Sequence, residues 1–414
     1  MTIVVHKYGG SSVATPERLQ AIAKRVVGEK RKGLQPIVVV SAMGRTTDAL
    51  LALAREVSEA SHRRELDMIL TAGERISMAL LAMAIGDQGC EAVSLTGSQA
   101  GIITTTDHNR ARIIEVRPVR VHEALTLGRI VIVGGFAGVS TEKEVTTLGR
   151  GGSDTTAIAL AAALQAQSCD IFSDVDGVYS ADPRVVNDAR KIDRLAAGEA
   201  LEMGLRGARV LAPEAVDYAR RHGVTLHARS SFSEGSGTVI TNEPSPGTGR
   251  AVAIASDDSV VPLRVEGPEA AISVLLDALD ATALVCREIC RSGGSHSSAC
   301  ELQLDTKNTA DWHDLIKQLS EMASAQGVTV EAFPDHGTVS VVGEGIAEQK
   351  PCWQIARHEL QLLGVEPRRI SSTPWGITAE VPRARLADVV RAWHRAFPGL
   401  TKEQQAEYLP TGAV

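Results

Sequence analysis

The sequence lacks the cysteine pattern of a disulfide-stabilised protein. Six cysteines are scattered along 414 residues, namely Cys90, Cys169, Cys286, Cys290, Cys300 and Cys352. Disulfide-stabilised proteins are usually short, secreted and dense in regularly spaced cysteines. We therefore expect free thiols and a cytoplasmic location, where cysteines stay reduced.

The chain also lacks a block of basic residues and a long apolar segment. Its net charge is −7, which makes nucleic acid and anionic membranes unexpected partners. No segment of about 18 residues reads as continuously apolar, so no membrane-spanning helix is expected. Residues Met1–Val5 enter a strand-like run at once, so no signal peptide is expected either.

What the chain does contain is typical of a globular α/β protein. Hydrophobic residues make up 44% and charged residues 22% of the sequence, and its length indicates two or three domains. Short β-branched runs recur at Ile3–Val5, Ile37–Val40, Ala92–Leu95, Ile130–Val133, Ile171–Ser173 and Thr225–His227. Helices are predicted between them, for example over Arg18–Lys30 and Ala196–Val210. This order predicts a mainly parallel open sheet with helices on both faces and ligands at the carboxyl ends of the strands.

Two glycine-rich turns indicate an anion site. Lys7–Val13 follows a strand-like run and precedes Pro16, a residue suited to the first turn of a helix. Gly149–Asp154 leads directly into an alanine-rich helix. Adjacent glycines let backbone N–H groups approach a ligand, and a helix start adds a positive dipole end. Lys7 alone could be a solvated residue at a strand end, because its turn has neither P-loop nor GxGxxG spacing.

Three further segments complete a recognisable pattern. Ser173–Arg184 leaves a strand with three carboxylates, a tyrosine and an arginine, and Leu70–Ser77 places an acid beside a base just after a glycine. With Ser41–Asp48 and the turns Lys7–Val13 and Leu148–Asp154, they form five motifs in order. In these motifs the chain resembles the aspartate kinases of the amino acid kinase superfamily.

The resemblance implies an enzyme that transfers the γ-phosphoryl of ATP to the side-chain carboxylate of L-aspartate. The product would be 4-phospho-L-aspartate, in the first step of aspartate-family (lysine and threonine) biosynthesis or of a dedicated branch of it. Mg²⁺ is expected with ATP, because the ion bridges phosphate oxygens and neutralises developing charge.

The resemblance also implies roles for individual residues. Lys7, Arg150 and Asp154 are expected to be catalytic: Lys7 contacts the transferring phosphoryl, Arg150 clamps a substrate carboxylate, and Asp154 organises the lysine and the metal-bound phosphates. Glu74 is expected to accept a hydrogen bond from the substrate ammonium group. The other substrate-binding residues are expected to be Ser41, Thr47 and Ser153. We expect the phosphates to lie beside the backbone of Gly9, Gly10 and Ser11.

The loop Ser173–Arg184 is expected to hold the nucleotide. Its contacts are expected to come from Ser173, Asp174, Tyr179, Asp182 and Arg184. Asp176 and Pro183 read as turn residues without a catalytic role. Arg209 stands where the family usually has a lysine that touches the nucleotide phosphates, and a guanidinium keeps that charge but not its compact shape.

A proline- and glycine-rich stretch separates this domain from the rest of the chain. We expect a catalytic domain over residues 1–242, a linker over 243–250 and a regulatory region over 251–414. The regulatory region repeats a strand–helix–strand–strand–helix order, which the resemblance identifies as two ferredoxin-like βαββαβ ACT domains. It also implies that the first (about 261–334) is inserted into the second (about 251–260 plus 335–414), so that Val252–Ala255 joins the second sheet.

The ACT pair is expected to mediate a homodimer and to respond weakly to feedback inhibitors. Strands such as Val339–Val342 would otherwise expose apolar faces and edges. At Ala283–Arg287 and Glu366–Arg368 the carboxylate and amide that grip an amino-acid effector in the family are missing or reversed in charge, and the turn at Gly267–Pro268 is shortened. Weak or no inhibition by lysine and threonine is therefore expected, with a different effector or a shifted alignment as the alternative.

Other interpretations fit the sequence less well. The residues Cys286, Cys290, His296 and Cys300 have no usual zinc spacing, so no protein-held metal is expected. His108 and His222 are expected to face solvent. A kinase of another acidic amino acid is one alternative function, and a catalytically silent regulatory subunit is another. The intact Lys7, Glu74, Arg150 and Asp154 argue against the silent subunit.

Overall fold

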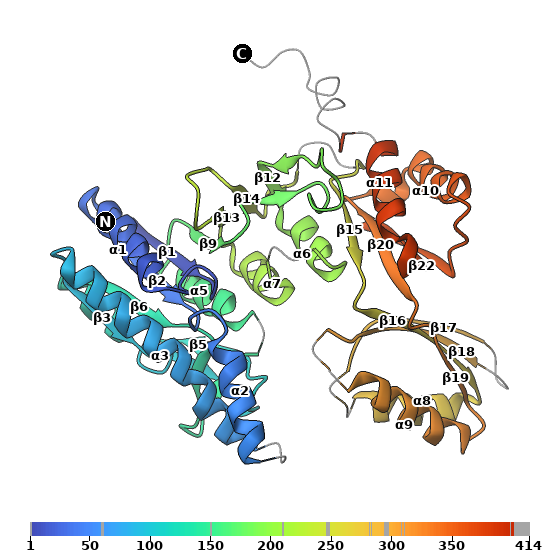
Figure 1. The fold of residues 1–414 in the computed structure, drawn as a ribbon, viewed down its shortest axis with the longest axis horizontal. Coiled ribbons are helices and arrows are strands. Elements are labelled where there is room, and N and C mark those ends of the chain that lie inside the picture. The colour runs from blue at the N-terminus through green and yellow to red at the C-terminus, as the bar shows by residue number, and fades with distance from the viewer. Residues whose placement is uncertain are drawn as a thin grey trace, which may run out of the picture. The chain divides into compact units, whose positions relative to one another are not determined.

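The structure is a computed structural model of the chain. It describes residues 2–58, 62–149, 151–208, 211–245, 249–280, 282, 284–293, 298–307, 309, 311–397 and 399–400. The chain forms two compact units, coloured along the sequence in Figure 1. The first comprises Met1–Val178, Lys191–Gly204 and Arg209–Pro246, and the second comprises Tyr179–Arg190, Leu205–Ala208 and Gly247–Val414.

An eight-stranded sheet forms the centre of the first unit, in the order β12-β14-β13-β9-β1-β2-β6-β3. Its strands are β1 (Thr2–Tyr8), β2 (Leu34–Val40), β3 (Ala92–Leu95), β6 (Ile130–Gly134), β9 (Cys169–Ser173), β12 (Arg194–Ala196), β13 (Leu226–Ser230) and β14 (Thr238–Thr241). Every neighbouring pair from β13 to β3 is parallel, and only β14 runs antiparallel to β13. The predicted mainly parallel sheet is confirmed.

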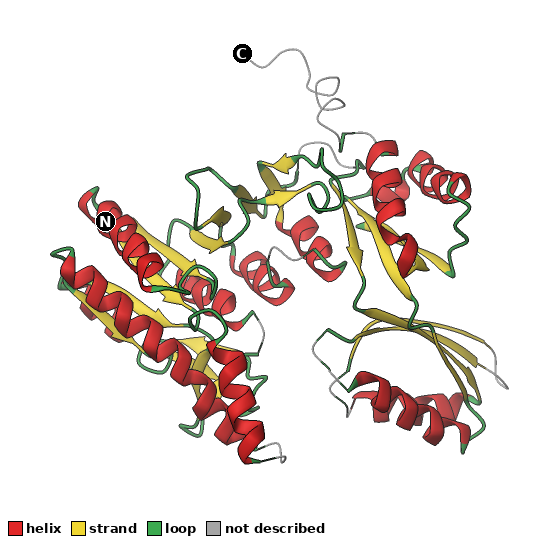
Figure 2. Ribbon diagram, viewed as in Figure 1, coloured by secondary structure: helices red, strands yellow, loops and turns green. Residues whose placement is uncertain are grey.

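Helices lie on both faces of this sheet (Figure 2). The helices between β1 and β13 are α1 (Pro16–Arg31), α2 (Thr46–Val57), α3 (Arg63–Asp87), α4 (Val119–Thr126), α5 (Gly152–Ala163), α6 (Ala197–Leu205) and α7 (Pro213–His222). On one face α1 and α3 pack on β2 and β6 through side chains such as Val26, Leu81 and Ile132. Side chains alternate along a strand, so β1 presents His6 to α1 and Lys7 to α5.

Two expectations about helices are wrong. The helix expected over Ala196–Val210 ends at Leu205, and Val210 lies outside the described residues. Gly207 has φ +102, and a Cβ there would lie 2.5 Å from the Ser256 carbonyl oxygen, so the chain turns out of the helix at this point.

The long helix α3 also corrects the expectation that no 18-residue segment is apolar. A window of α3 has a mean hydropathy of 1.5 and is long enough to cross a membrane, by length and composition alone. The adjacent Glu74 and Arg75 interrupt the apolar run, which hides it in the sequence. Leu70, Leu81 and Ile85 are buried in the unit, as is usual for a core helix of this kind.

A second, four-stranded sheet of the first unit was not predicted. It has the order β5-β4-β7-β8, with β4 (Ile102–Thr104), β5 (Ile113–Val116), β7 (Ala137–Ser140) and β8 (Val145–Thr147). These strands have only three or four residues, too few to show a periodic pattern. The sheet leads the chain from β8 into the glycine-rich turn before α5. Two further short strands are β10 (Val178–Tyr179) and β11 (Lys191–Ile192).

The second unit contains two antiparallel four-stranded sheets, ordered β17-β18-β16-β19 and β15-β20-β22-β21. The first is built from β16 (Val260–Gly267), α8 (Glu269–Asp280), β17 (Val285–Gly293), β18 (Ser298–Asp305), α9 (Trp312–Ser324) and β19 (Thr329–Ala332). The second uses β15 (Ala253–Asp257), β20 (His336–Val342), α10 (Lys350–Leu362), β21 (Arg369–Thr373), β22 (Gly376–Pro382) and α11 (Leu386–Ala396), with 3-10 turns at Ile346–Glu348 and Arg383–Arg385.

Both sheets have the strand order of a ferredoxin-like βαββαβ fold, as expected. In Figure 1, α8 and α9 cover one face of the first sheet. The second sheet takes its fourth strand from β15, which precedes the first sheet in sequence and pairs antiparallel with β20 from Ala253↔Val342 to Asp257↔Thr338. Large side chains such as Trp393 and Phe397 fill the core of the second sheet.

Candidate active site

The candidate site lies at the carboxyl ends of the central strands β1, β2 and β6. Lys7 is the next-to-last residue of β1, and its Nζ lies 2.6 Å from Asp154 Oδ1 in the first turn of α5. Both side chains are largely buried, with exposed fractions of 13% and 12%. A buried ammonium and carboxylate neutralise each other, and they can separate to contact a charged substrate.

Glycines allow the turns after β1 and β2 to touch. A Cβ on Gly10 would lie 3.0 Å from the Ala42 carbonyl oxygen, closer than most side chains tolerate. The Gly44 N–H donates to the Gly10 carbonyl at 3.0 Å, and the Gly9 N–H donates to the Phe172 carbonyl at 3.2 Å. These hydrogen bonds hold the glycine-rich turn in place beside Lys7. We call the backbone of Gly9 and Gly10 the ledge.

Glu74 reaches this ledge from α3. Its Oε1 accepts a hydrogen bond from the Ala42 N–H at 3.0 Å, and its Oε2 is buried with no hydrogen-bond partner among the described residues. Burial raises the pKa of the Glu74 carboxyl to about 7. Gly73 makes this approach possible, because a Cβ there would lie only 2.6 Å from Ala42 Cβ. The site therefore holds a buried acceptor ready for a cationic group.

A glycine pair at the end of β6 connects the two walls of the site. A Cβ on Gly134 would lie 3.4 Å from Glu74 Cβ, and one on Gly135 would lie 2.8 Å from Ser153 Cβ. Neither glycine was among the residues predicted from the sequence. The available signal was the same one used elsewhere, a glycine pair directly after a β-branched run.

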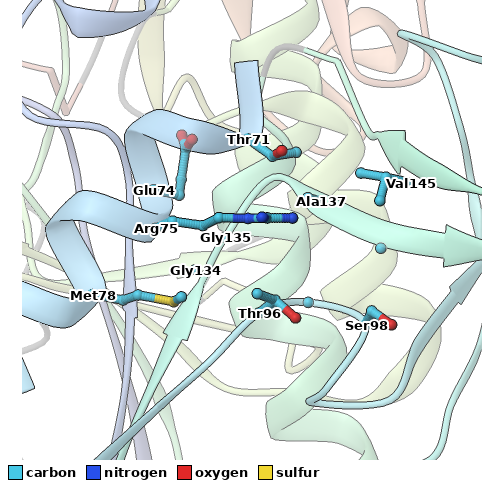
Figure 3. Close-up of a pocket in the computed structure, with 12 residues that line it drawn as sticks. Thr71, Glu74, Arg75, Met78, Thr96, Ser98, Gly134, Gly135, Ala137 and Val145 are labelled. Carbon is cyan, nitrogen blue, oxygen red and sulfur yellow. The ribbon is translucent and has the colours of Figure 1, made fainter. Parts of the chain in front are cut away.

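A small pocket opens beside Glu74 (Figure 3). Its lining comprises Thr71, Glu74, Arg75, Met78, Thr96, Gly97, Ser98, Gly134, Gly135, Ala137, Gly138 and Val145. In Figure 3, Arg75 extends across the pocket past Gly135, with Thr96 and Ser98 on one side and Glu74 and Thr71 on the other. A carboxylate, a guanidinium and hydroxyls around one cavity can bind a small molecule that carries both charges.

The second glycine-rich turn leads into α5. Gly149 and Gly151 have φ values of +78 and +73, a left-handed conformation that favours glycine. Gly151 also packs tightly, since a Cβ there would lie 2.4 Å from Ala212 Cβ. Ser153 and Asp154 occupy the first turn of the helix, where the dipole favours an anion. Arg150 lies outside the described residues.

The other predicted substrate-side residues lie in or next to these turns. Ser41 is half-buried, and its N–H donates to the Tyr8 carbonyl at 3.1 Å. Thr47 is half-buried in the first turn of α2. Ser11 is exposed, and its carbonyl accepts from the Arg18 guanidinium.

The predicted nucleotide loop is divided between the two compact units. Ser173 ends β9 and its hydroxyl contacts the Val175 backbone, while Asp174 is exposed. Tyr179, Asp182 and Arg184 belong to the second unit. There Arg184 donates to Asp182, with Nη2 2.6 Å from Oδ2. Arg209 lies outside the described residues.

A polar cluster around Asp67 was missed, and it shows that the expectation for His108 is wrong. His108 is only partly exposed, and its Nδ1 lies 2.7 Å from Oδ2 of the fully buried Asp67 on α3. His222 is exposed, as expected. The sequence separates His108 from Asp67 by 41 residues, and no local pattern connects them.

The thiols and acids of the described residues include no cluster of three metal-ligating side chains. Cys300 is buried in the core of the first small sheet, whereas Cys290 is exposed. His296 lies outside the described residues.

Comparisons with known proteins agree with one another. Residues 2–230 match the amino acid kinase family. Aspartokinase from Mycobacterium tuberculosis (strain ATCC 25618 / H37Rv) is 43% identical over 430 residues, which cover 100% of this chain and 100% of the relative. Aspartokinase from Geobacillus stearothermophilus is 40% identical over 411 residues, covering 98% and 99%.

Solved structures extend the likeness to the fold. E. coli aspartokinase III in complex with aspartate and ADP superposes with a TM-score of 0.79 at 24% identity, over 95% of this chain and 99% of that chain. The same enzyme in complex with lysine and aspartate superposes with a TM-score of 0.74 at 25% identity and the same coverage.

Proposed function

This chain belongs to the amino acid kinase family, as one of its aspartokinases, and we propose how its residues carry out the reaction. It transfers the γ-phosphoryl of ATP to the side-chain carboxylate of L-aspartate. The observation that supports the proposed mechanism best is the buried Lys7–Asp154 pair beside the Gly9–Gly10 ledge, at the carboxyl end of the sheet. Phosphoryl transfer depends on positioning and on neutralising charge, and this arrangement offers both.

We propose that Lys7 contacts the transferring phosphoryl and that Asp154 holds the ammonium in place until ATP binds. The Gly9, Gly10 and Ser11 backbone then lies along the phosphates. Asp154 is the acid best placed to orient a Mg²⁺ ion that is held mainly by phosphate oxygens. That ion would supply charge neutralisation on the phosphates.

Aspartate is proposed to bind between Glu74 and the start of α5. The ammonium group of the amino acid would pair with the buried Glu74 Oε2, which has no other partner among the described residues. Ser153 lies across the Gly134–Gly135 pair from Glu74 and is proposed to contact the substrate. Arg150 is proposed to clamp a carboxylate. Hydroxyls are proposed to come from Ser41 and Thr47.

The roles assigned to the nucleotide loop stay predictions from the sequence. Ser173 and Asp174 are proposed to contact the nucleoside, because they lie at the carboxyl end of β9, the strand next to β1 in the sheet. Further contacts to ATP are proposed from Tyr179, Asp182, Arg184 and Arg209.

An activity assay tests this assignment. ADP release would be measured with L-aspartate, with L-glutamate and with no acceptor, for the wild type and for Lys7→Ala. We expect turnover with L-aspartate alone, and a fall of at least about 100-fold in Lys7→Ala, since a phosphate-directed charge is worth several kcal/mol in the transition state. Normal turnover in Lys7→Ala would refute the mechanism, and preference for L-glutamate would assign the chain to another acidic amino acid.

We further propose a homodimer formed through the first small sheet. The expected exposure of Val339–Val342 is wrong, because β20 is a central strand and these residues are buried within their own unit. The edge strand β17 is mostly exposed instead, and it presents Val285 and Ile289, with exposed fractions of 53% and 56%. An apolar edge strand is suited to pairing with a second copy. Light scattering that reports a monomer at micromolar concentration would refute the dimer.

Weak control by lysine and threonine is proposed on the same unit. Arg287 pairs with Asp257 and Asp305, each at 2.5 Å, so these carboxylates are already neutralised. Arg368 pairs in the same way with Glu301 and Glu380. An effector must bind one state better than another, and its ammonium finds these acids occupied. Inhibition by either amino acid at sub-millimolar concentration would show that it binds elsewhere.

A further inference from the structure

Asp67 is a fully buried acid that the proposed mechanism does not use. It lies on α3, seven residues before Glu74 and therefore on the same helix face, two turns away. Its Oδ1 accepts from the Thr147 hydroxyl at 2.6 Å, and its Oδ2 contacts His108 Nδ1 at 2.7 Å. The Asn109 N–H donates to both oxygens, at 3.2 and 3.3 Å. A buried carboxylate requires such partners, so the cluster has a defined geometry.

The partners of Asp67 belong to the segments that deliver the glycine-rich turn to α5. Thr147 is the last residue of β8, two residues before Gly149. The Ala111 N–H donates to the Thr147 carbonyl at 3.0 Å, and a Cβ on Gly149 would lie 3.3 Å from the Asn109 carbonyl oxygen. Asn109 itself has φ +66, a conformation uncommon outside glycine. Asp67 thus fixes the point from which the chain enters α5.

Hydrogen-bond chemistry determines the state of this cluster. An ionised carboxylate can only accept, so the Nδ1 atom of His108 must carry a proton. The His108 side chain is 22% exposed, so part of the ring reaches solvent. Thr147 is then held by Oδ1 and Asn109 by both oxygens, and replacing either oxygen by an amide nitrogen would place a donor against a donor.

We propose that Asp67 is a positioning residue for phosphoryl transfer. Through Thr147 and Asn109 it sets the start of α5, which carries Ser153 and Asp154, at a fixed distance from Glu74 on its own helix. It therefore links two sides of the site. One is α3, whose Glu74 is proposed to bind the substrate ammonium, and the other is the start of α5, whose Asp154 pairs with Lys7. The proposal rests on the aspartokinase function assigned to this site. A buried acid that serves stability alone would leave substrate affinity unchanged.

Steady-state kinetics of Asp67→Asn test the proposal. The amide keeps the shape and removes the charge, so we expect kcat/KM for L-aspartate to fall about 10- to 100-fold, as for the loss of a hydrogen bond to a charged group. KM for ATP should change less, within about twofold, because the Gly9–Gly10 backbone is held by hydrogen bonds to Phe172 and Gly44 and not by Asp67. Glu65→Gln is the matched control: Glu65 lies two residues away on α3 and is exposed beside Arg64, so its kinetics should match the wild type.

Thr147 provides a second test that does not depend on the folding of Asp67→Asn. Thr147→Ser keeps the hydroxyl and should retain wild-type kinetics, whereas Thr147→Val should lower kcat/KM for L-aspartate about tenfold. The proposal is overturned if Asp67→Asn or Thr147→Val lowers only the melting temperature, or raises both KM values equally. Failure of the function itself is separable, because Lys7→Ala would then keep its turnover.

Discussion

At the scale of single residues, Glu74 is a buried carboxylate of the candidate site that lacks a full set of hydrogen-bond partners among the described residues. It is 6% exposed, its pKa is raised to about 7 by burial, and only one of its oxygens has a partner among the described residues. A cationic ligand would stabilise the ionised form of such a carboxylate, because it offsets the free-energy cost of burying the charge.

The pH dependence of aspartate binding should therefore follow Glu74. The ammonium group requires the ionised carboxylate, so kcat/KM for L-aspartate should fall about tenfold per pH unit below the Glu74 pKa of about 7. Glu74→Gln should raise KM for L-aspartate and remove this step from the profile. A profile for Glu74→Gln that still falls below pH 7 would assign the titration to another group.

Stability should respond to Glu74 in the opposite sense. Its pKa is higher in the folded protein than the ordinary 4.5, so the folded state binds the extra proton between these values. This contribution to the free energy of unfolding is present below pH 4.5 and is lost as the pH rises through 7. At pH 8, Glu74→Gln should be more stable than the wild type by about 2 to 3 kcal/mol, and equal to it at pH 4, as measured by urea unfolding.

Residues of the site were predictable where a local motif placed them. Lys7, Glu74 and Asp154 stand in glycine-rich turns or beside a glycine, and the structure brings them to one end of the sheet. Asp67 and His6 were not predictable, because their partners are distant in sequence. The Nδ1 atom of His6 lies 3.3 Å from Oε2 of Glu29 on α1, and burial lowers the pKa of His6 to about 4. Nothing near His6 in the sequence indicates a buried polar side chain.

At the scale of elements, the approach of α3 to the turn after β2 determines where Glu74 lies. Gly73→Ala would place a methyl group 2.6 Å from Ala42 Cβ, so either α3 or the turn must move. We expect a loss of about 1 to 3 kcal/mol of stability. The Glu74–Ala42 hydrogen bond should also be lost, with kcat/KM lowered at least about tenfold.

Gly86→Ala is the matched control in the same helix. A Cβ at Gly86 meets nothing within 4 Å, so alanine should stabilise α3 by about 0.5 to 1 kcal/mol and leave kinetics unchanged. Thermal unfolding and initial rates of both variants would be compared. Equal effects of the two substitutions would contradict the close contact at Gly73.

Elements with a clear hydrophobic period were predicted to within a few residues. The run Ala92–Leu95 is β3, and the run Ile130–Val133 is β6 without its last residue. The sheet of β4, β5, β7 and β8 was missed because its strands are short and pair across long sequence separations. Tertiary contact rather than local preference forms such strands.

At the scale of the whole molecule, a buried ion network joins the two small sheets of the second unit. Arg368 contacts Glu301 in β18 and Glu380 in β22, and the Gln303 amide donates to Glu380 at 2.7 Å. Glu380 is 1% exposed, so its charge depends on these partners. The Arg368 guanidinium is therefore engaged by carboxylates of its own chain.

Arg368→Met should destabilise the second unit by about 3 kcal/mol, because it leaves a buried carboxylate short of a partner. Arg264→Met, which breaks the exposed pair with Glu266, should change stability by less than about 0.5 kcal/mol. Urea unfolding of both variants measures the difference. Equally small losses of stability in the two variants would mean that Arg369 alone is enough to neutralise the buried Glu380 carboxylate.

The placement of β15 has a consequence for the order in which the chain folds. β15 pairs with β20 across about 80 residues, a loop whose closure is entropically costly when the intervening chain is unstructured. Once the inserted sheet has formed, β16 and β19 lie side by side, and the loop shortens to roughly a dozen residues, a saving of about 2 kcal/mol. The inserted sheet is complete at Ala332, before β20 begins at His336. During synthesis from the N-terminus, the inserted sheet can therefore fold first and bring β15 and β20 of the other sheet close together.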